Sequence, residues 1–320
     1  MISIIIPAFN AEKTISKTLK SVLDSSFMDF ELIVVDDGST DNTQNAVSGF
    51  PVRMIKLGSC SGPACARNLG AKEARGDVLL FLDSDVCVRG DTVQKMLETL
   101  RESRADAAVA IYSQESINRG FFRNFKALHN YSYSKFRGPQ ISAHTVFATF
   151  CAMIRKDLFM ELGGFDVAYR SNDVEDYELG YRIVDRGYKL VRNRAIEVDH
   201  HFPGFLRGIK LYYRRTYFWT GLFLRRKKFD AGGTSPKDAA GMLAGCLAAI
   251  SLLTGGYFLS VPLFVFFMLC FSDFFKLALR QKGAVFLTFA ILTQLFLSVV
   301  VSAAAAHAAG GVWLKEIIGN

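Results

Sequence analysis

The chain lacks the cysteine patterns of zinc-binding, redox and disulfide-rich proteins. Its 320 residues contain only six cysteines, and no C-x-x-C pair with a matching histidine spacing is present. We therefore expect reduced, mostly buried thiols without a catalytic role, because a nucleophilic thiol needs an activating base and none is indicated. The first residues, MISIIIPAFN, also lack the basic segment of a signal peptide. The N-terminal part is therefore expected to stay in the cytosol.

Acidic residues are scarce in one region. Between residues 204 and 237, nine lysines and arginines stand against one acid, Asp230, so this region carries the net charge of +8 that the whole chain has. A patch this local argues against a nucleic-acid-binding surface and favours the anionic face of a membrane. Aromatic side chains alternate with the basic ones from Phe205 to Phe223. The sequence therefore predicts a basic amphipathic segment at 204–237 that lies at the membrane surface.

Long apolar runs are confined to residues 238–320. Two of them, Ala239–Tyr257 and Ala284–Leu314, contain no charged residue and are long enough to cross a bilayer. A third run, Phe258–Leu279, is interrupted near its end by Asp273 and Lys276. We expect a membrane anchor of two or three helices; three would place the cationic loop near Lys282 in the cytosol, as the positive-inside rule requires. The expected location is the cytoplasmic membrane, multi-pass, with the N-terminal domain facing the cytosol.

The first 203 residues alternate between expected strands and helices. Apolar runs at 2–6 and 78–82 fit buried strands, further strands are expected at 31–35, 52–57 and 107–111, and the segments at 11–25 and 91–101 are expected to be helices. This order predicts βαβ units with right-handed crossovers and one parallel sheet covered on both faces. A dinucleotide-binding domain would need G-x-G-x-x-G after the first strand, where the chain has Pro-Ala-Phe-Asn. An oxidoreductase is thereby excluded.

Two carboxylates follow the strand expected at 78–82. Asp83 and Asp85 are two residues apart, so in extended chain both point the same way at the carboxyl edge of the sheet, where open α/β sheets bind ligands. Asp36 and Asp37 end another strand at the same edge. Carboxylates so close repel one another unless a cation lies between them. A divalent ion with oxygen ligands is the simplest candidate for that cation, and a pair of solvated turn aspartates is the alternative that this motif alone leaves open.

Four stretches, in this order and spacing, resemble family 2 of the inverting glycosyltransferases: SIIIPAFNAEKTI, VVDDGSTDNT, GPACARNLGAKEARGDVLLFLDSDV and FDVAYRSNDVEDYELGYRIVDRGYKL. The match runs from about Met1 to His201. It implies an α/β, Rossmann-like GT-A domain at 1–203, which binds a nucleotide diphosphate sugar, and it does not cover the apolar C-terminal part.

The resemblance also implies roles for individual residues. The substrate-binding positions are Pro7, Phe9 and Asn10 over the nucleotide, Asp37 at its base, Arg67 in the donor site, Asp83 at the ribose, and Glu175. A divalent metal, Mn²⁺ or Mg²⁺, would be held by Asp85 with Asp83 and His200. His200 is favoured over His201 because it alternates with the buried Val198. For Glu175, a first-turn acid that stabilises the helix dipole is an equally good interpretation.

The catalytic base implied by the resemblance is Asp176. On a helix that opens near Asp173, it shares one face with Leu179, Gly180 and Ile183. A carboxylate on an apolar face has a raised pKa, which moves it towards useful base strength.

The expected reaction is inverting transfer of a sugar from a UDP- or GDP-sugar to a hydroxyl of a membrane lipid or lipid-linked acceptor. A polyprenyl phosphate acceptor is an alternative; it is already ionised and would hardly need Asp176. A third possibility, a membrane protein that binds nucleotide without catalysis, is disfavoured by the intact Asp83, Asp85 and Asp176. The processive members' Q-x-x-R-W motif is missing, so a polymerase is not expected. No nucleic-acid partner is expected.

Overall fold

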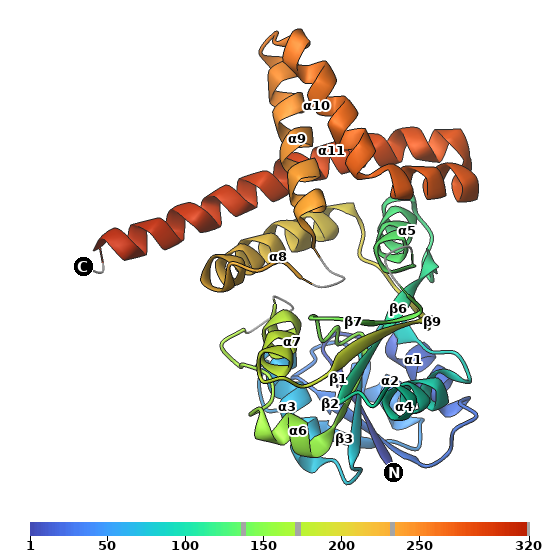
Figure 1. Ribbon diagram of the computed structural model, residues 1–320. Coiled ribbons are helices and arrows are strands. Elements are labelled where there is room, and N and C mark those ends of the chain that lie inside the picture. The colour runs from blue at the N-terminus through green and yellow to red at the C-terminus, as the bar shows by residue number, and fades with distance from the viewer. Residues whose placement is uncertain (136–138, 170–173, 231–233, 319–320) are drawn as a thin grey trace. The chain divides into compact units, whose positions relative to one another are not determined.

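The computed structural model describes residues 1–135, 139–169, 174–230 and 234–318, with the backbone alone from residue 312. Within these residues the chain divides into two compact units (Figure 1). The first comprises Met1–Ile117 and Arg137–His201, and the second comprises Asn118–Phe136 and Phe202–Asn320. The helix that follows residue 117 thus groups with the C-terminal helices. The functional division at residues 203 and 237 stays a prediction.

The first unit is built on a mixed sheet with the order β3-β2-β1-β4-β8-β6-β9-β5, and β7 pairs with β9. The strands are β1 Ile2–Ala8, β2 Phe30–Asp36, β3 Arg53–Lys56, β4 Val78–Leu82, β5 Val86–Cys87, β6 Ala107–Ser116, β7 Ile141–Ala143, β8 Cys151–Arg155 and β9 Leu190–His200. The first four strands in that order are parallel, as the sequence predicts. Their carboxyl ends therefore meet at one edge.

The prediction of an entirely parallel sheet was wrong. Strand β8 lies antiparallel between β4 and β6, with Cys151 opposite Leu82 at the end of β4. The short strands β5 and β7 also pair antiparallel, both with β9. Strand β8 begins where β4 ends, so the two strands run in opposite directions.

Helices cover both faces of this sheet, and a separate apolar core lies between the sheet and the helices on each face. The apolar residues of β1 alternate between the cores, so that Ile4 and Ile6 face one and Ile5 the other. The helices α1 Ile15–Leu23, α2 Thr43–Ser48 and α4 Thr92–Ser103 pack on the first core, and α3 Pro63–Glu73, α6 Lys156–Glu161 and α7 Glu175–Asp185 pack on the second. A strand buried on both faces explains the continuous apolar runs in the sequence.

The second unit is helical. It contains α5 Phe121–Lys135, α8 Phe205–Arg226, α9 Pro236–Leu253, α10 Tyr257–Cys270 and α11 Ser272–Ile318. In Figure 1, α9 and α10 run side by side as a hairpin. Helix α11 consists of two helical segments joined at Gly283, whose φ of 83° reverses the chain. Phenylalanines of α5, α10 and α11 share one core, with Phe125, Phe267 and Phe274 buried in it.

Two described helices are long and apolar enough to cross a membrane: Pro236–Leu253 and Ser272–Gly311. The span predicted at 258–279 is not one continuous helix, because α10 ends at Cys270 and α11 begins at Ser272. Ser272 and Asp273 are residue types that favour the start of a helix. The 14 residues of α10 measure about 21 Å along the helix axis, less than the roughly 30 Å of a bilayer's hydrocarbon core.

Gly70 lets α3 approach the sheet, which gives a test of the packing. A Cβ at this position would lie 2.4 Å from Cγ2 of the buried Ile5. We expect Gly70→Ala to destabilise the chain by about 1–3 kcal/mol, the usual cost of overpacking, as measured by chemical unfolding in detergent. Gly49→Ala, with open space around it, is the control. If Ile5→Ala in the Gly70→Ala background adds its full single-variant cost, the two residues do not clash.

Candidate active site

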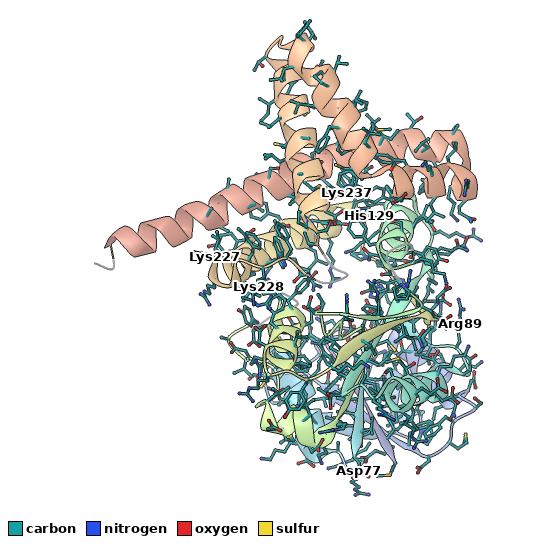
Figure 2. The ribbon with its side chains drawn as sticks, viewed as in Figure 1. Asp77, Arg89, His129, Lys227, Lys228 and Lys237 are labelled. Carbon is teal, nitrogen blue, oxygen red and sulfur yellow. The ribbon has the colours of Figure 1, made fainter. Side chains whose placement is uncertain are left out.

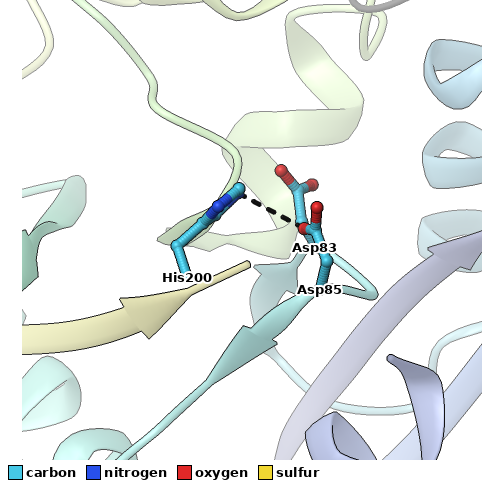
Figure 3. Close-up of side chains that lie close together, drawn as sticks. All are labelled: Asp83, Asp85 and His200. Carbon is cyan, nitrogen blue, oxygen red and sulfur yellow. Dashed lines mark ion pairs between the residues drawn. The ribbon is translucent and has the colours of Figure 1, made fainter. Parts of the chain in front are cut away.

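Three side chains converge at the carboxyl edge of the sheet (Figure 3). Asp83, Asp85 and His200 each offer one ligand atom, and these atoms all lie within 4.8 Å of one another. The Nε2 atom of His200 is 3.3 Å from Oδ1 of Asp85. The predicted carboxylate pair and the predicted histidine are thus neighbours, although more than 110 residues separate them in the chain.

A short strand pair brings His200 to the carboxylates. In the antiparallel pairing of β5 with β9, Val86 lies opposite His200. The next residue, His201, donates its backbone N–H to the carbonyl oxygen of Asp85 at 2.9 Å. This backbone bond places the side chain of His200 in the cluster and agrees with the choice of His200 over His201. The ring of Tyr112, 5.2 Å from the imidazole, packs edge-on against it.

The electrostatics of the cluster favour a cation. Burial raises the pKa of Asp85, the imidazole of His200 opposes this rise, and the charge of Asp83 adds to it. Two carboxylate oxygens and one imidazole nitrogen are a donor set that suits Mn²⁺ or Mg²⁺. A divalent ion there would relieve the repulsion between the two aspartates. The residues present therefore fit the expected cofactor.

Arg67 lies beneath this cluster, and its side chain is only 1% exposed. One guanidinium nitrogen is 2.7 Å from Oδ1 of Asp83, and another is 3.0 Å from Oε1 of Glu175. Burial opposes the charged form, but the two carboxylates outweigh it and raise the pKa of Arg67 above its ordinary value. Arg67 was expected in the donor site; it is buried against Asp83 and Glu175, and any role toward the donor stays a prediction.

Glu175 and Asp176 open helix α7, and both are buried. The predicted helix start near Asp173 lies outside the described residues. The predicted apolar face is confirmed, since Leu179 and Ile183 are fully buried on the same side as Asp176. This arrangement puts a buried carboxylate on the element that Arg67 ties to the metal-binding cluster.

Backbone contacts fix the position of Asp176 at the start of α7. Its carbonyl oxygen accepts a hydrogen bond of 3.1 Å from the N–H of Phe147. One turn later, a Cβ on Gly180 would lie 2.3 Å from the carbonyl oxygen of Thr145. The missing side chain thus lets the helix lie directly on the segment at 145–147.

Asn10 and Asp37 hold the loops at the predicted donor side. Asn10 has a φ of 50°, and its Oδ1 accepts hydrogen bonds from the backbone N–H groups of Thr40 and Asp41 at 2.9 and 3.3 Å. The carboxylate of Asp37, which is 3% exposed, accepts from the N–H groups at positions 61 and 62. Both side chains therefore support loop conformations, and their contact with a nucleotide stays a prediction.

The two remaining predicted donor residues precede Asn10. Pro7 lies inside β1, opposite Val35 of β2. Phe9 follows the end of the strand with 48% of its surface exposed, which is high for a phenylalanine beside a buried strand. An exposed ring at the carboxyl edge of the sheet is suitably placed to contact a planar base.

The ion pair between Arg67 and Glu175 was missed at the sequence level. A signal for it exists: the buried face of α3 consists of Ala64, Ala66, Gly70 and Ala71 together with Arg67. A single charge on a face of small residues requires buried partners of opposite sign. The pattern could have predicted such partners, but not which carboxylates they are.

Comparison with known proteins identifies the family. The model of glycosyl transferase family 2 matches residues 3–163, about half of the chain. The chain belongs to glycosyl transferase family 2. This confirms the resemblance found in the sequence and shows that the protein is a glycosyltransferase.

Relatives of this family 2 glycosyltransferase carry glycosyltransferase names. An uncharacterized glycosyltransferase of Haemophilus influenzae is 31% identical over 180 residues, which cover 56% of this chain and 60% of that protein. The Escherichia coli protein WfgD, named UDP-Glc:alpha-D-GlcNAc-diphosphoundecaprenol beta-1,3-glucosyltransferase, is 46% identical over 88 residues, 27% of this chain and 35% of that one. WfaP of the same species has the same activity name and is 28% identical over 201 residues, 62% and 75% of the two chains. The chain spans about two fifths to three fifths of the length of the first curated relatives.

Solved structures confirm the GT-A fold. The mannosyltransferase PcManGT from Pyrobaculum calidifontis, in complex with GDP-Man and Mn²⁺, has a TM-score of 0.59 at 17% identity and covers 96% of this chain and 86% of its own. S. aureus TarS 1-349 with UDP-GlcNAc has a TM-score of 0.53 at 18% identity, covering 96% and 91%. The α/β fold of this family 2 glycosyltransferase is therefore that of enzymes that use nucleotide sugars.

Removing Arg67 tests its role in the site. Arg67→Met would leave Glu175 buried without its cation, so we expect a loss of about 3–5 kcal/mol in the free energy of unfolding, measured by chemical denaturation. Arg67→Met with Glu175→Gln should recover part of this loss, because the uncompensated charge is gone. A double variant no more stable than the single one would mean that the Glu175 pair contributes little.

Proposed function

We propose that this glycosyltransferase moves a sugar, with inversion, from a metal-bound nucleotide diphosphate sugar to a hydroxyl of a membrane-associated lipid or lipid-linked acceptor. The observation that carries the proposal is the cluster of Asp83, Asp85 and His200, which Arg67 and Glu175 link to the helix of Asp176. A metal-binding site and a buried carboxylate are thus built into one network of ion pairs. This is the arrangement that a leaving diphosphate and a nucleophilic hydroxyl require.

In this proposal, Asp85 and His200 hold the divalent metal, with Asp83 beside them. Bound there, Mn²⁺ or Mg²⁺ would supply positive charge to the diphosphate as it departs. Asp83 has one oxygen paired with Arg67, which leaves its other oxygen for the metal or the ribose of the donor. The ion pair with Arg67 fixes the orientation of the Asp83 carboxylate, so this side chain need not rearrange when the donor binds.

The donor side is assigned to the loops after β1 and β2. Pro7 and Phe9 would cover the nucleotide, while Asn10 and Asp37 keep the two loops in place through their backbone hydrogen bonds. Either a UDP- or a GDP-sugar suits this arrangement. PcManGT was solved with GDP-Man and TarS 1-349 with UDP-GlcNAc, so the similar structures include both kinds of donor.

Asp176 is the proposed general base, which takes the proton from the acceptor hydroxyl. The Escherichia coli relatives favour this over the polyprenyl phosphate alternative, because their names describe a β-1,3 linkage made to a lipid-linked GlcNAc, which means transfer to a sugar hydroxyl. A hydroxyl must lose its proton as it attacks, and a buried carboxylate can accept it.

The second unit is proposed to attach the enzyme to the cytoplasmic membrane, multi-pass, with the catalytic unit in the cytosol. Helices α9 and α11 are sufficiently apolar. Basic residues stand at the end of α8 and the start of α9, where Lys227, Lys228 and Lys237 are found (Figure 2). Cations at these positions suit the anionic inner leaflet.

Asp85→Ala should abolish turnover and metal-dependent donor binding, since Asp83 alone cannot hold the ion against two phosphates. Titration calorimetry with UDP and GDP, each with and without Mn²⁺, measures this directly. The matched control is Asp24→Ala, which removes an exposed carboxylate at the end of α1. Full activity of the enzyme in chelator would refute the metal assignment.

Asp176→Asn should preserve donor and metal affinity but lower kcat by roughly two to four orders of magnitude, the usual contribution of a general base. Steady-state kinetics on a lipid-linked saccharide acceptor provide the measurement, and the neighbouring Glu178→Gln is the control. Turnover that barely changes would instead favour an acceptor that is already ionised, such as a polyprenyl phosphate.

The proposed topology assigns opposite sides of the membrane to two positions. The first helical segment of α11 carries Lys276, Arg280 and Lys282, so its end should be cytosolic, and the chain after Gly283 should then cross to the far side. A reporter that is active only in the cytosol should work when fused at Lys282 and fail after Asn320. The opposite pattern would exclude this orientation.

A further inference from the structure

A stacked pair of aromatic rings lies directly beside the metal-binding cluster. Tyr112, on β6, and Phe150, which precedes β8, stack with ring centroids 3.8 Å apart and planes 22° apart. The ring of Tyr112 also contacts the imidazole of His200, with centroids 5.2 Å apart and planes at 87°. Offset-stacked and perpendicular arrangements are the two that aromatic rings favour. His200 therefore packs against a ring that a second ring supports.

The backbone of Phe150 is bonded to another part of the cluster. Strands β4 and β8 pair antiparallel as far as Leu82 and Cys151. One residue further, the N–H of Asp83 donates to the carbonyl oxygen of Phe150 at 3.4 Å, which continues this ladder. The side chain of Phe150 is 8% exposed and belongs to the first apolar core. The aromatic pair thus contacts His200 through a ring and Asp83 through the backbone.

A bulge in β6 lies between Tyr112 and the residue opposite His200. Along the parallel pair of β6 and β9, Tyr112 is opposite Val198, and Ser116 is opposite His200. Four steps along β6 thus match two along β9, and bulges next to active sites commonly redirect side chains. The carbonyl oxygen of His200 accepts a hydrogen bond of 3.1 Å from the N–H of Ile117. The strand on the far side of the bulge therefore holds the backbone of the histidine.

The imidazole of His200 needs a further contact to keep its ring nitrogens in one direction. The last side-chain torsion of histidine has broad minima, so a fixed backbone alone leaves the ring free to turn. In the orientation that Tyr112 contacts, Nε2 lies 3.3 Å from Oδ1 of Asp85 (Figure 3). Groups that orient a ligating imidazole typically contribute roughly 10–100-fold to metal affinity. The ring of Tyr112 is in the position to supply such a contribution.

We propose that Tyr112 is a positioning residue of the metal site. Its ring, supported by Phe150, holds the imidazole of His200 with Nε2 towards the two aspartates. Tyr112 acts through His200 and does not itself bind the ion, so its aromatic ring carries the role and its hydroxyl does not. The proposal rests on the proposed function, which requires a divalent ion at this cluster.

The Mn²⁺ affinity of the full-length chain in detergent tests this without turnover, by electron paramagnetic resonance titration with UDP and, separately, with GDP. Tyr112→Leu should weaken Mn²⁺ binding about tenfold, whereas Tyr112→Phe, which keeps the ring, should stay within about twofold. Phe150→Leu removes the supporting ring and should weaken binding about threefold or more. The matched control is Phe50→Leu, because Phe50 is also a partly buried ring on the first core and lies two residues beyond the end of α2. It should stay within about twofold.

Two further readouts separate positioning from general destabilisation. In the His200→Asn background, Tyr112→Leu should cause no further loss of Mn²⁺ affinity, because its effect passes through the imidazole. The imidazole nitrogen modulation of bound Mn²⁺ in electron spin echo spectra should weaken in Tyr112→Leu and persist in Tyr112→Phe.

An unchanged Mn²⁺ affinity in Tyr112→Leu or Phe150→Leu would overturn the proposal and leave the metal assignment intact. So would an equal loss in Phe50→Leu, or a tenfold loss from Tyr112→Leu that persists in the His200→Asn background. An equal loss in Tyr112→Phe would also overturn it, because the hydroxyl would then carry the effect. If the unmodified chain binds no Mn²⁺ with either nucleotide, the metal assignment itself fails, and this proposal fails with it.

Discussion

The buried guanidinium of Arg67 is the interaction on which the active site depends. A charge that is 1% exposed is tolerated only because Asp83 and Glu175 neutralise it on two sides. These three residues come from α3, from the end of β4 and from the start of α7. The two ion pairs of Arg67 therefore set the distance between the end of β4, which leads to Asp83 and Asp85, and the start of α7, which carries Asp176.

The cluster of Asp83, Asp85 and His200 uses the same principle with a different cation. Here Arg67 pairs with Asp83 but not with Asp85, and His200 and His201 partly offset the rise that burial and the charge of Asp83 cause in the pKa of Asp85. Arg67 thus compensates Asp83 and Glu175, and we propose that Asp85 is compensated by an ion that arrives with the donor. This division explains how two neighbouring acidic groups can have different tasks.

Much of the sheet and of the cluster at its carboxyl edge was predictable from the sequence, for identifiable reasons. The strands before Asp36 and Asp83 are buried on both faces, so their apolar runs are unambiguous, and parallel neighbours bring these aspartates to one edge. His200 followed from the resemblance to the family, and alternation along β9 favoured it over His201. The direction of β8 did not follow, because it depends on where the chain returns from the second unit, and hydrophobicity carries no information on strand direction. The pairing of Arg67 with Glu175 was missed because these two residues, 108 positions apart in the chain, meet only through the fold.

The second unit also has features that could not be predicted from the sequence, because they depend on how its helices pack. Composition identified its apolar segments, but the break at Phe271 and the packing of α9 on its neighbours depend on local shape. Gly241 faces Cys270 and Phe271, and Gly245 faces Ser298 of α11, at distances where any Cβ would clash. Small residues at such contacts let helices approach closely, as is common where water does not drive their association.

The most direct test of the account is whether His200 and the two aspartates hold one metal ion together with the nucleotide. Mn²⁺ bound to the full-length chain with UDP or GDP can be examined by electron spin echo envelope modulation, which detects a ligand nitrogen. The account predicts modulation from one imidazole nitrogen, which disappears in His200→Asn and persists in His201→Asn. No nitrogen modulation in the unmodified protein, or modulation unchanged in His200→Asn, would contradict the account.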